Sequence, residues 1–308
     1  MLRPILIAAF MLLAAIGAKA APADDAFEAY KKGDYATALK LLKPLAEQGN
    51  VTAEYNVGVM YNEALGVKAD YAEASKWFLK AVAKGNVYAQ VDLALLYEYG
   101  RGVKKDYNEA LRLFHLAADK KNPSAEVNLG AMYERGIGVT QDYKEAARWY
   151  RLSSDHGNGN AQYSLGLMYA NGRGVPQDNK QAALWYRKSG EQGNASAQLN
   201  LGAMSYDGQG VPKDPKEALK WFRMAAQQGN GRAQFNLATL YTNGEGAPQN
   251  LARALVWFNA AAVTLTGDQS KIADENSKAV AAKMNRDQIL AAKLMAQKCK
   301  DGDFKDCE

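Results

Sequence analysis

The sequence predicts an all-α protein built from stacked helical hairpins. Three observations support this fold class. One pattern recurs every 36 residues without insertions, each copy carries two apolar stripes at helical spacing, and the ends of the helices are marked by capping residues. The six full copies begin at Val51, Val87, Pro123, Gly159, Ala195 and Gly231.

Each copy contains the apolar stripes of two helices. Positions 3, 7, 8 and 11 form the first stripe: Ala, then Leu or Val, then Gly or Ala, then Tyr in every copy except at Ser205. Positions 24, 27, 28 and 31 form the second, and all five tryptophans occupy position 27. Small and large residues alternate, so the two helices can approach closely. Neither helix buries its apolar stripe alone, so neighbouring copies must stack.

The helix ends are equally regular. Position 20 is Asp in five copies and Asn250 in the sixth, which predicts an N-cap for the second helix. A glycine pair such as Gly136 and Gly138 precedes each cap. One such pair ahead of a helix could cradle a phosphate or form a turn. Recurrence of the pair in every copy, with Ala64 replacing one glycine, favours a turn with positive φ angles and close backbone approach.

The N-terminus predicts an export signal. Residues 1–20 contain an early Arg3, an apolar run from Ile5 to Ile16 and an Ala-Lys-Ala cleavage signature, so we expect a mature chain starting near residue 21. An uncleaved N-terminal anchor is the alternative. The mature chain would not insert into a membrane, because no second long apolar run follows.

The predicted domains are a signal peptide (1–20), a shortened N-terminal copy acting as a cap (21–50), six full repeats (51–262) and a C-terminal cap (263–308). The C-terminal cap holds two further helices within residues 267–298. Cys299 and Cys307, the only cysteines, are close in sequence, and in an exported protein they predict a small disulfide loop. Metal ligation by this pair would need additional ligands.

The repeat resembles the Sel-one-like repeat (SLR) family, a relative of the tetratricopeptide repeat (TPR) with a longer inter-helix turn. Residues 159–194, "GNAQYSLGLMYANGRGVPQDNKQAALWYRKSGEQGN", follow the family pattern almost throughout. The resemblance spans roughly residues 24–262. It implies a right-handed α-solenoid that binds other proteins on its curved surface. Exported bacterial members are similar to adaptors or regulators in envelope signalling, surface assembly and host interaction.

Composition and motifs argue against several function classes. Removing residues 1–20 takes away Arg3 and Lys19 and no acidic residue, so the formal net charge falls from +5 to +3. The Lys and Arg residues of the chain are interleaved with Asp and Glu and do not gather into a basic stripe, which disfavours nucleic-acid binding. No cofactor or metal motif is present, and the two histidines, His115 and His156, are predicted to have surface roles.

Enzymatic chemistry has no support in the motifs. A cysteine-rich subgroup of the resembled family has been linked to β-lactams, but no repeat here contains a cysteine. No serine is followed by a lysine three residues later, so the nucleophile motif of serine β-lactamases is absent. We therefore expect no catalytic residue. An enzyme or enzyme accessory acting on β-lactam or cell-wall substrates remains a weaker alternative.

By analogy with tetratricopeptide solenoids, positions 2, 5, 6, 9, 12 and 13 of the first helices face the concave side. Position 6 is a ladder of short polar groups and position 5 is aromatic or aliphatic, which suits an extended peptide. The alternative is that both positions pack between repeats. The predicted protein-binding residues are Tyr55, Asn56, Tyr88, Asp92, Asn128, Tyr163, Asn200, Phe235 and Asn236; further specificity candidates are Tyr99, Arg135, Tyr206 and Arg232.

These observations predict a non-enzymatic scaffold or regulator of the bacterial cell envelope that binds a protein partner. The expected location is the periplasm. A secreted factor binding host surfaces is the alternative, and no sequence feature separates the two. The partner's identity, the pathway and the oligomeric state are left open.

Overall fold

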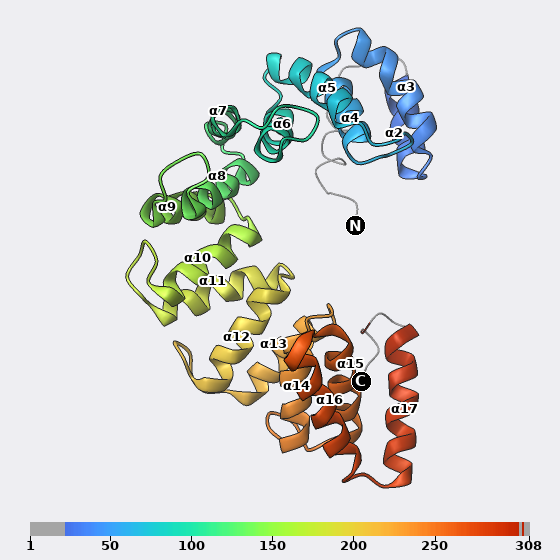
Figure 1. Cartoon of the computed structure of the whole chain (residues 1–308), viewed down its shortest axis with the longest axis vertical. Coiled ribbons are helices and arrows are strands. Elements are labelled where there is room, and N and C mark those ends of the chain that lie inside the picture. Colours follow the sequence, from blue (N-terminus) through green and yellow to red (C-terminus); the bar gives the residue numbers. More distant parts are fainter. Residues whose placement is uncertain (1–21, 302–303, 305–308) are drawn as a thin grey trace. The chain divides into compact units, whose positions relative to one another are not determined.

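Helix boundaries repeat with the period of the sequence. The computed structural model describes residues 22–301 and residue 304, and this part of the chain forms sixteen helices and no strand (Figure 1). The predicted signal peptide and Cys307 lie outside the described residues. Cys299 is buried near the end of the last helix, and its disulfide with Cys307 stays a prediction.

The helices fall into two compact units, Met1–Asp142 and Tyr143–Glu308. The helices of unit 1 are α2 (Pro22–Lys31), α3 (Tyr35–Glu47), α4 (Val51–Asn62), α5 (Tyr71–Ala83), α6 (Val87–Tyr99), α7 (Tyr107–Ala118) and α8 (Pro123–Arg135). The helices of unit 2 are α9 (Tyr143–Asp155), α10 (Gly159–Asn171), α11 (Asn179–Glu191), α12 (Ala195–Asp207), α13 (Pro215–Ala226), α14 (Gly231–Asn243), α15 (Leu251–Thr264), α16 (Gly267–Ala281) and α17 (Arg286–Asp301).

Within each unit, the two helices of a repeat pack as a hairpin, and the second helix packs on the first helix of the next repeat. In unit 1 these repeat-to-repeat contacts join α3 to α4, α5 to α6 and α7 to α8; in unit 2 they join α11 to α12 and α13 to α14. The predicted all-α solenoid of stacked helix-turn-helix repeats is confirmed. The period of 36 residues, and not local helix propensity, sets this order, because only stacking buries the apolar stripes.

Side-chain caps fix both helices of a repeat. The carboxylates of Asp34, Asp70, Asp106, Asp178 and Asp214, and the amide of Asn250, accept hydrogen bonds from backbone N–H groups at the start of the second helices. The sequence analysis assigned no cap to the first helices. There, the last residue of the preceding repeat acts, with Asn50, Asn86, Asn122, Asn158, Asn194 and Asn230 each accepting from the Ala at position 3.

The two glycines of the inter-helix turn have different roles. The first ends the first helix in the left-handed conformation, as at Gly208 (φ +77), and Ala64 takes the same conformation (φ +57) in the first full repeat. The second lies against the preceding repeat: a Cβ on Gly210 (φ +71) would stand 2.2 Å from the carbonyl oxygen of Asn179 at the start of α11. The turn interpretation is therefore supported by geometry.

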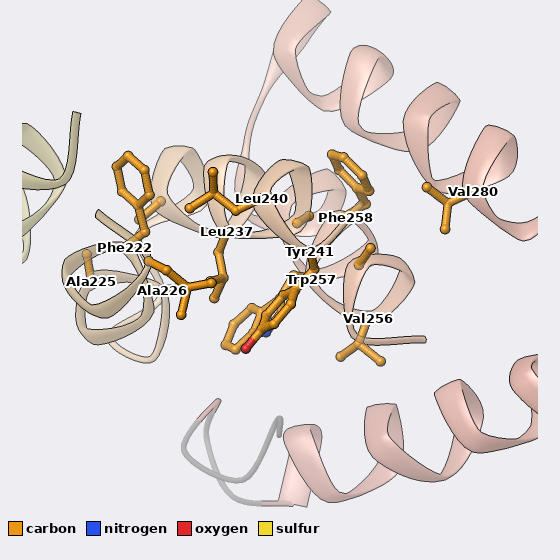
Figure 2. Close-up of a cluster of buried hydrophobic side chains, with 14 of the residues drawn as sticks. Phe222, Ala225, Ala226, Leu237, Leu240, Tyr241, Val256, Trp257, Phe258 and Val280 are labelled. Carbon is orange, nitrogen blue, oxygen red and sulfur yellow. The ribbon is translucent and has the colours of Figure 1, made fainter. Parts of the chain in front are cut away.

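The core lies between the paired helices. In the last full repeat Leu237 and Tyr241 of α14 meet Trp257 of α15, and all three side chains are fully buried (Figure 2). Position 8 is small because the second helix crosses it closely: a Cβ on Gly202 would come within 2.6 Å of the Phe222 ring. The alternation of small and large residues is thus a packing requirement.

The first-helix spacing continues beyond the last recognised repeat. Helix α16 begins at Gly267, 36 residues after Gly231, and packs on α15 as the first helix of a seventh copy would. From the sequence we predicted only a capping helix here, and Ala273 and Ser277 stand at the positions where the full repeats usually have Leu and Tyr. Helix α17 packs on α15, and Asn285 caps it by accepting from the Gln288 N–H at 2.9 Å.

Candidate functional site

In unit 1 the predicted binding residues are largely occupied by packing between repeats. The Tyr55 ring lies 5.9 Å from the Phe78 ring and 6.0 Å from the Tyr88 ring, and its hydroxyl donates to Asp92 Oδ2 at 3.0 Å. Tyr55 is 3% exposed and Asn56 is fully buried. In this repeat positions 5 and 6 are therefore buried by packing, as the alternative interpretation of these positions predicts.

The other unit 1 candidates are more accessible. Asn128 is partly buried and donates from Nδ2 to the Ser124 carbonyl oxygen of its own helix at 2.7 Å. Tyr88 is 37% exposed beside Tyr55, and Tyr99 is 56% exposed at the end of α6, where Arg101 lies 5.4 Å from its ring centre. Arg135 is exposed at the end of α8.

In unit 2 the predicted residues stay partly exposed. Tyr163 lies 5.9 Å from Tyr186, Phe235 lies 5.2 Å from Phe258, and both Asn200 and Asn236 are partly buried. Tyr206 is partly buried and Arg232 is exposed. Tyr163 and Phe235, both at position 5, therefore pack on their own hairpins and remain partly exposed.

A groove in unit 2 is lined by residues of two successive repeats, and five of them occupy first-helix positions predicted to face the concave side: Leu167, Ala170, Asn171, Asn200 and Ala203. Its volume is about 520 Å³, and none of its ten lining residues is charged. We call it the amide groove because five of those residues carry carboxamides. Its residues are Leu167, Ala170, Asn171, Gln177, Asn179, Tyr186, Asn200, Ala203, Met204 and Gln209.

Hydrogen bonds orient several groups in the amide groove. Asn171 Nδ2 donates to the Leu167 carbonyl oxygen at 2.8 Å and Gln177 Nε2 donates to that of Ala170 at 2.9 Å, so each side-chain oxygen is left to accept. Burial raises the pKa of Tyr186 to about 12, and a hydrogen bond with Asn200 offsets part of this effect. The phenol is therefore neutral at physiological pH.

A smaller hollow lies in the same unit where the last full repeat meets α16. Its volume is about 220 Å³, and its lining is mostly apolar. It includes positions 2, 5 and 6 of the last full repeat, three of the positions predicted to face a partner. We call it the end cavity; its residues are Arg232, Phe235, Asn236, Leu265, Gln269 and Ile272. A third hollow, in unit 1, lies on α3 and is lined in part by Lys40, Lys43 and Tyr61.

A buried polar ladder, which the sequence analysis missed, joins the repeats at position 4. Gln198 Nε2 donates to the Gly190 carbonyl oxygen of the preceding repeat at 2.8 Å, and Gln198 Oε1 accepts from Gln228 at 2.8 Å. The signal was present, since position 4 is Glu or Gln in every copy: Glu54, Gln90, Glu126, Gln162, Gln198 and Gln234. These side chains hold the stack together and are not available to a partner.

Position 29 supplies a second link between repeats. Arg223 donates to the Tyr241 hydroxyl of the next repeat at 2.7 Å, and Asn259 accepts from Ser277 of α16 at 2.6 Å. Where Ser205 replaces the tyrosine, Arg187 pairs instead with Glu217 at 2.8 Å. At position 29, Arg187 and Arg223 thus link successive repeats.

Neither metal binding nor membrane spanning has a structural basis in the described residues. Within residues 22–301 no group of three or more His, Cys, Asp and Glu residues is arranged to hold a metal ion. In the same range, no helix combines the length and apolar character that a membrane crossing requires. His115 is partly buried on α7, and His156 is exposed after α9.

Comparison with known proteins settles the family. The sequence profile of the Sel1 repeat matches residues 28–50, 51–86, 87–122, 123–158, 159–194, 195–230 and 231–262. The chain belongs to the Sel1 repeat family. The match at 28–50 agrees with the shortened N-terminal copy, and the resemblance to Sel-one-like repeats is confirmed.

The solved structure of another Sel1 repeat protein supports this assignment. A Sel1 repeat protein from Oxalobacter formigenes is 34% identical, with a TM-score of 0.67 over 79% of this chain and 97% of that one. A protective antigen of uropathogenic Escherichia coli with an SLR fold is 28% identical, with a TM-score of 0.44 over 89% of this chain and 73% of that one. No curated protein matches this chain significantly.

Sel1 repeat proteins are generally protein-interaction scaffolds, and the fold is typically non-enzymatic. The general class of function therefore follows from the family. The partner and the surface that binds it do not.

Proposed function

We propose that this Sel1 repeat protein is a non-enzymatic scaffold or regulator of the bacterial cell envelope that binds a protein partner along the first helices of unit 2. The observation that carries the proposal is the amide groove, half of whose ten lining residues occupy positions expected to face a partner. The export signature of residues 1–20 supports a periplasmic location.

The chemistry of the amide groove suits an extended peptide backbone. Each carboxamide can both donate and accept a hydrogen bond, as a peptide unit does. Asn171 on α10 and Gln177 in the following turn are both already held by carbonyl oxygens of α10, so binding would cost little additional side-chain entropy. The absence of charge in the lining disfavours nucleic acid, whose recognition depends on Lys and Arg.

The volume also fits this use. About 520 Å³ lies within the range of sites that hold a ligand of several residues or a small molecule. Leu167 and Met204 line the groove beside the amides, and they provide an apolar surface against which a side chain of the peptide can pack.

A matched pair of glutamines tests the proposal. Gln177 and Gln249 occupy the same repeat position and make the same bond, Gln249 donating to the Thr242 carbonyl oxygen at 2.8 Å, but only Gln177 lines the groove. Affinity capture from envelope extracts should recover a partner with wild type and Gln249→Leu. Gln177→Leu combined with Asn200→Leu should weaken binding of the partner about thirtyfold, since each of the two lost hydrogen bonds costs about 1 kcal/mol.

Salt provides a second criterion. Because the groove carries no charge, we expect the capture to survive about 0.5 M NaCl, at which exposed charge pairs are strongly screened. Equal recovery by the wild type and the groove variant would show that the partner binds elsewhere.

Recovery of the mature protein in the osmotic-shock fraction, with an N-terminus near residue 21, is the result expected for a periplasmic protein. Recovery in the medium would favour the secreted alternative.

A further inference from the structure

The end cavity lies at a repeat junction whose counterpart between α4 and α6 is filled by the chain's own side chains. In the junction between α4 and α6, Tyr88 at position 2 covers Tyr55 at position 5 of the preceding repeat, with 6.0 Å between ring centres. Asp92 at position 6 then accepts from the Tyr55 hydroxyl at 3.0 Å. Two side chains of the following first helix thus complete the surface over the aromatic ring.

The junction between α14 and α16 lacks this cover. Phe235 occupies position 5, and the in-phase start of α16 at Gly267 places Asp268 at position 2 and Ile272 at position 6. Asp268 is paired with Lys271 at 3.1 Å, and its side chain is 89% exposed, so it does not lie over Phe235. The hollow that results is the end cavity.

The size of the end cavity limits what can fill it. At about 220 Å³ it is below the range of sites that enclose a whole small molecule, and it suits a single large side chain. Phe235, Leu265 and Ile272 make its surface mainly apolar, and Ile272 is 47% exposed. An aromatic or large aliphatic group would gain the packing that Tyr88 supplies to Tyr55.

The edge of the end cavity is positively charged. Arg232, at position 2 of the last full repeat, is exposed and lines the cavity with Gln269 and Asn236. Two acids of α16 near the cavity already have lysine partners, because Asp268 pairs with Lys271 and Asp274 pairs with Lys278. A carboxylate on the ligand, next to its apolar group, would therefore complement the guanidinium.

We propose that the end cavity binds one aromatic or large aliphatic side chain of a protein partner, with a neighbouring Asp or Glu of that partner placed against Arg232. The inference rests on the proposed function, since it assigns a second contact to the same class of ligand on the same kind of first-helix positions. It adds a sequence preference that the uncharged amide groove does not provide.

The test uses the mature chain with ¹³C-labelled Ile and Leu methyl groups and three capped dipeptides. Acetyl-Glu-Phe-amide should shift the methyl signals of Ile272 and Leu265 in a saturable way. Acetyl-Gln-Phe-amide should bind about threefold more weakly, the effect of one exposed charge pair, and Arg232→Gln should remove that difference. Acetyl-Glu-Ala-amide should give no saturable shift.

Two variants at one exposed position separate filling of the cavity from loss of charge. Asp268→Tyr places a tyrosine where Tyr88 lies in the earlier junction, so it should cover Phe235 and reduce dipeptide binding at least tenfold. Asp268→Asn removes the same charge and should bind as wild type does. Absence of a saturable shift in wild type, or equal affinity of wild type and Asp268→Tyr with native helical content, overturns the inference.

The two proposals fail independently. If the amide groove binds the partner and the end cavity does not, capture remains sensitive to Gln177→Leu with Asn200→Leu while the dipeptides give no shift. If the end cavity binds the dipeptide and the amide groove does not bind the partner, acetyl-Glu-Phe-amide gives a saturable methyl shift, and Gln177→Leu with Asn200→Leu captures the partner as well as wild type does.

Discussion

Alanine substitutions at three glycines of unit 2 distinguish two contributions to stability: the backbone strain of a positive φ angle, and the clash of a Cβ atom with the preceding repeat. All three have positive φ: +91° at Gly193, +77° at Gly208 and +71° at Gly210. A Cβ at Gly193 would meet no atom within 4 Å, and one at Gly208 would meet Lys213 Cβ at 3.2 Å. One at Gly210 would lie 2.2 Å from the backbone oxygen of Asn179. Replacement by alanine therefore adds a backbone clash only at Gly210.

The expected losses of unfolding free energy follow from this geometry. Gly193→Ala and Gly208→Ala should each cost about 1–2 kcal/mol, the cost of a left-handed conformation for a residue with a Cβ. The φ of +57° at Ala64 shows that the first turn position accepts alanine. Gly210→Ala should cost at least about 3 kcal/mol, because the clash is with backbone that packing holds in place and the start of α11 must shift.

Urea denaturation followed by far-ultraviolet circular dichroism measures the three losses under one condition. The decisive quantity is the difference between Gly210→Ala and Gly208→Ala, since strain is similar in the two. Equal losses would show that contact between repeats does not require the second glycine. The explanation of the recurrent pair given above would then be wrong.

Three further changes test the polar contacts. Partial burial opposes ionisation of Glu217, but hydrogen bonds from Arg187 and Trp221 outweigh it and lower its pKa. Its stabilisation is then present above the unfolded-state pKa of about 4.3 and is lost as pH falls through the lower folded-state pKa. In urea titrations Glu217→Gln should therefore cost about 1 kcal/mol at pH 7, and this cost should shrink as the pH is lowered below the unfolded-state pKa. Burial raises the pKa of Glu98, so its effect has the opposite sign: stability is lost as pH rises through the folded-state pKa. Glu98→Gln should equal wild type near pH 3 and exceed it at pH 7, and lower stability at pH 7 would contradict the assignment. Asn194→Ala removes the cap on the Ala197 N–H and should lower the thermal midpoint by the equivalent of about 1 kcal/mol; an unchanged midpoint would show that the cap contributes nothing.

The repeat made most of the fold predictable. Helix type, hairpin order and the turn glycines could be inferred because the same residue recurs wherever the same contact recurs, as with Trp at position 27. The N-caps of the first helices were missed, since an Asn after Gly indicates the end of one helix as readily as the start of the next. The continuation into α16 was missed because its boundaries keep the period while its side chains do not.

The candidate site was less predictable, for a physical reason. The repeat position fixes which way a side chain points, but the neighbouring repeat decides whether it is covered. Tyr55 and Phe235 occupy the same position, yet Tyr88 covers the first and no aromatic residue of α16 covers the second. Such pairwise complementarity between successive repeats is not visible in the pattern of one repeat.

The central claim is that the first helices of unit 2 bind a protein partner through the amide groove. Site-specific photo-crosslinking in intact cells tests it most directly, with a photoreactive phenylalanine analogue at Ala203 in the groove and, as control, at the exposed Lys220 of α13. The account predicts a discrete crosslinked protein from position 203 that is absent at position 220 and is lost when Gln177→Leu and Asn200→Leu are added. No adduct at position 203, or the same adduct from both positions, would contradict it.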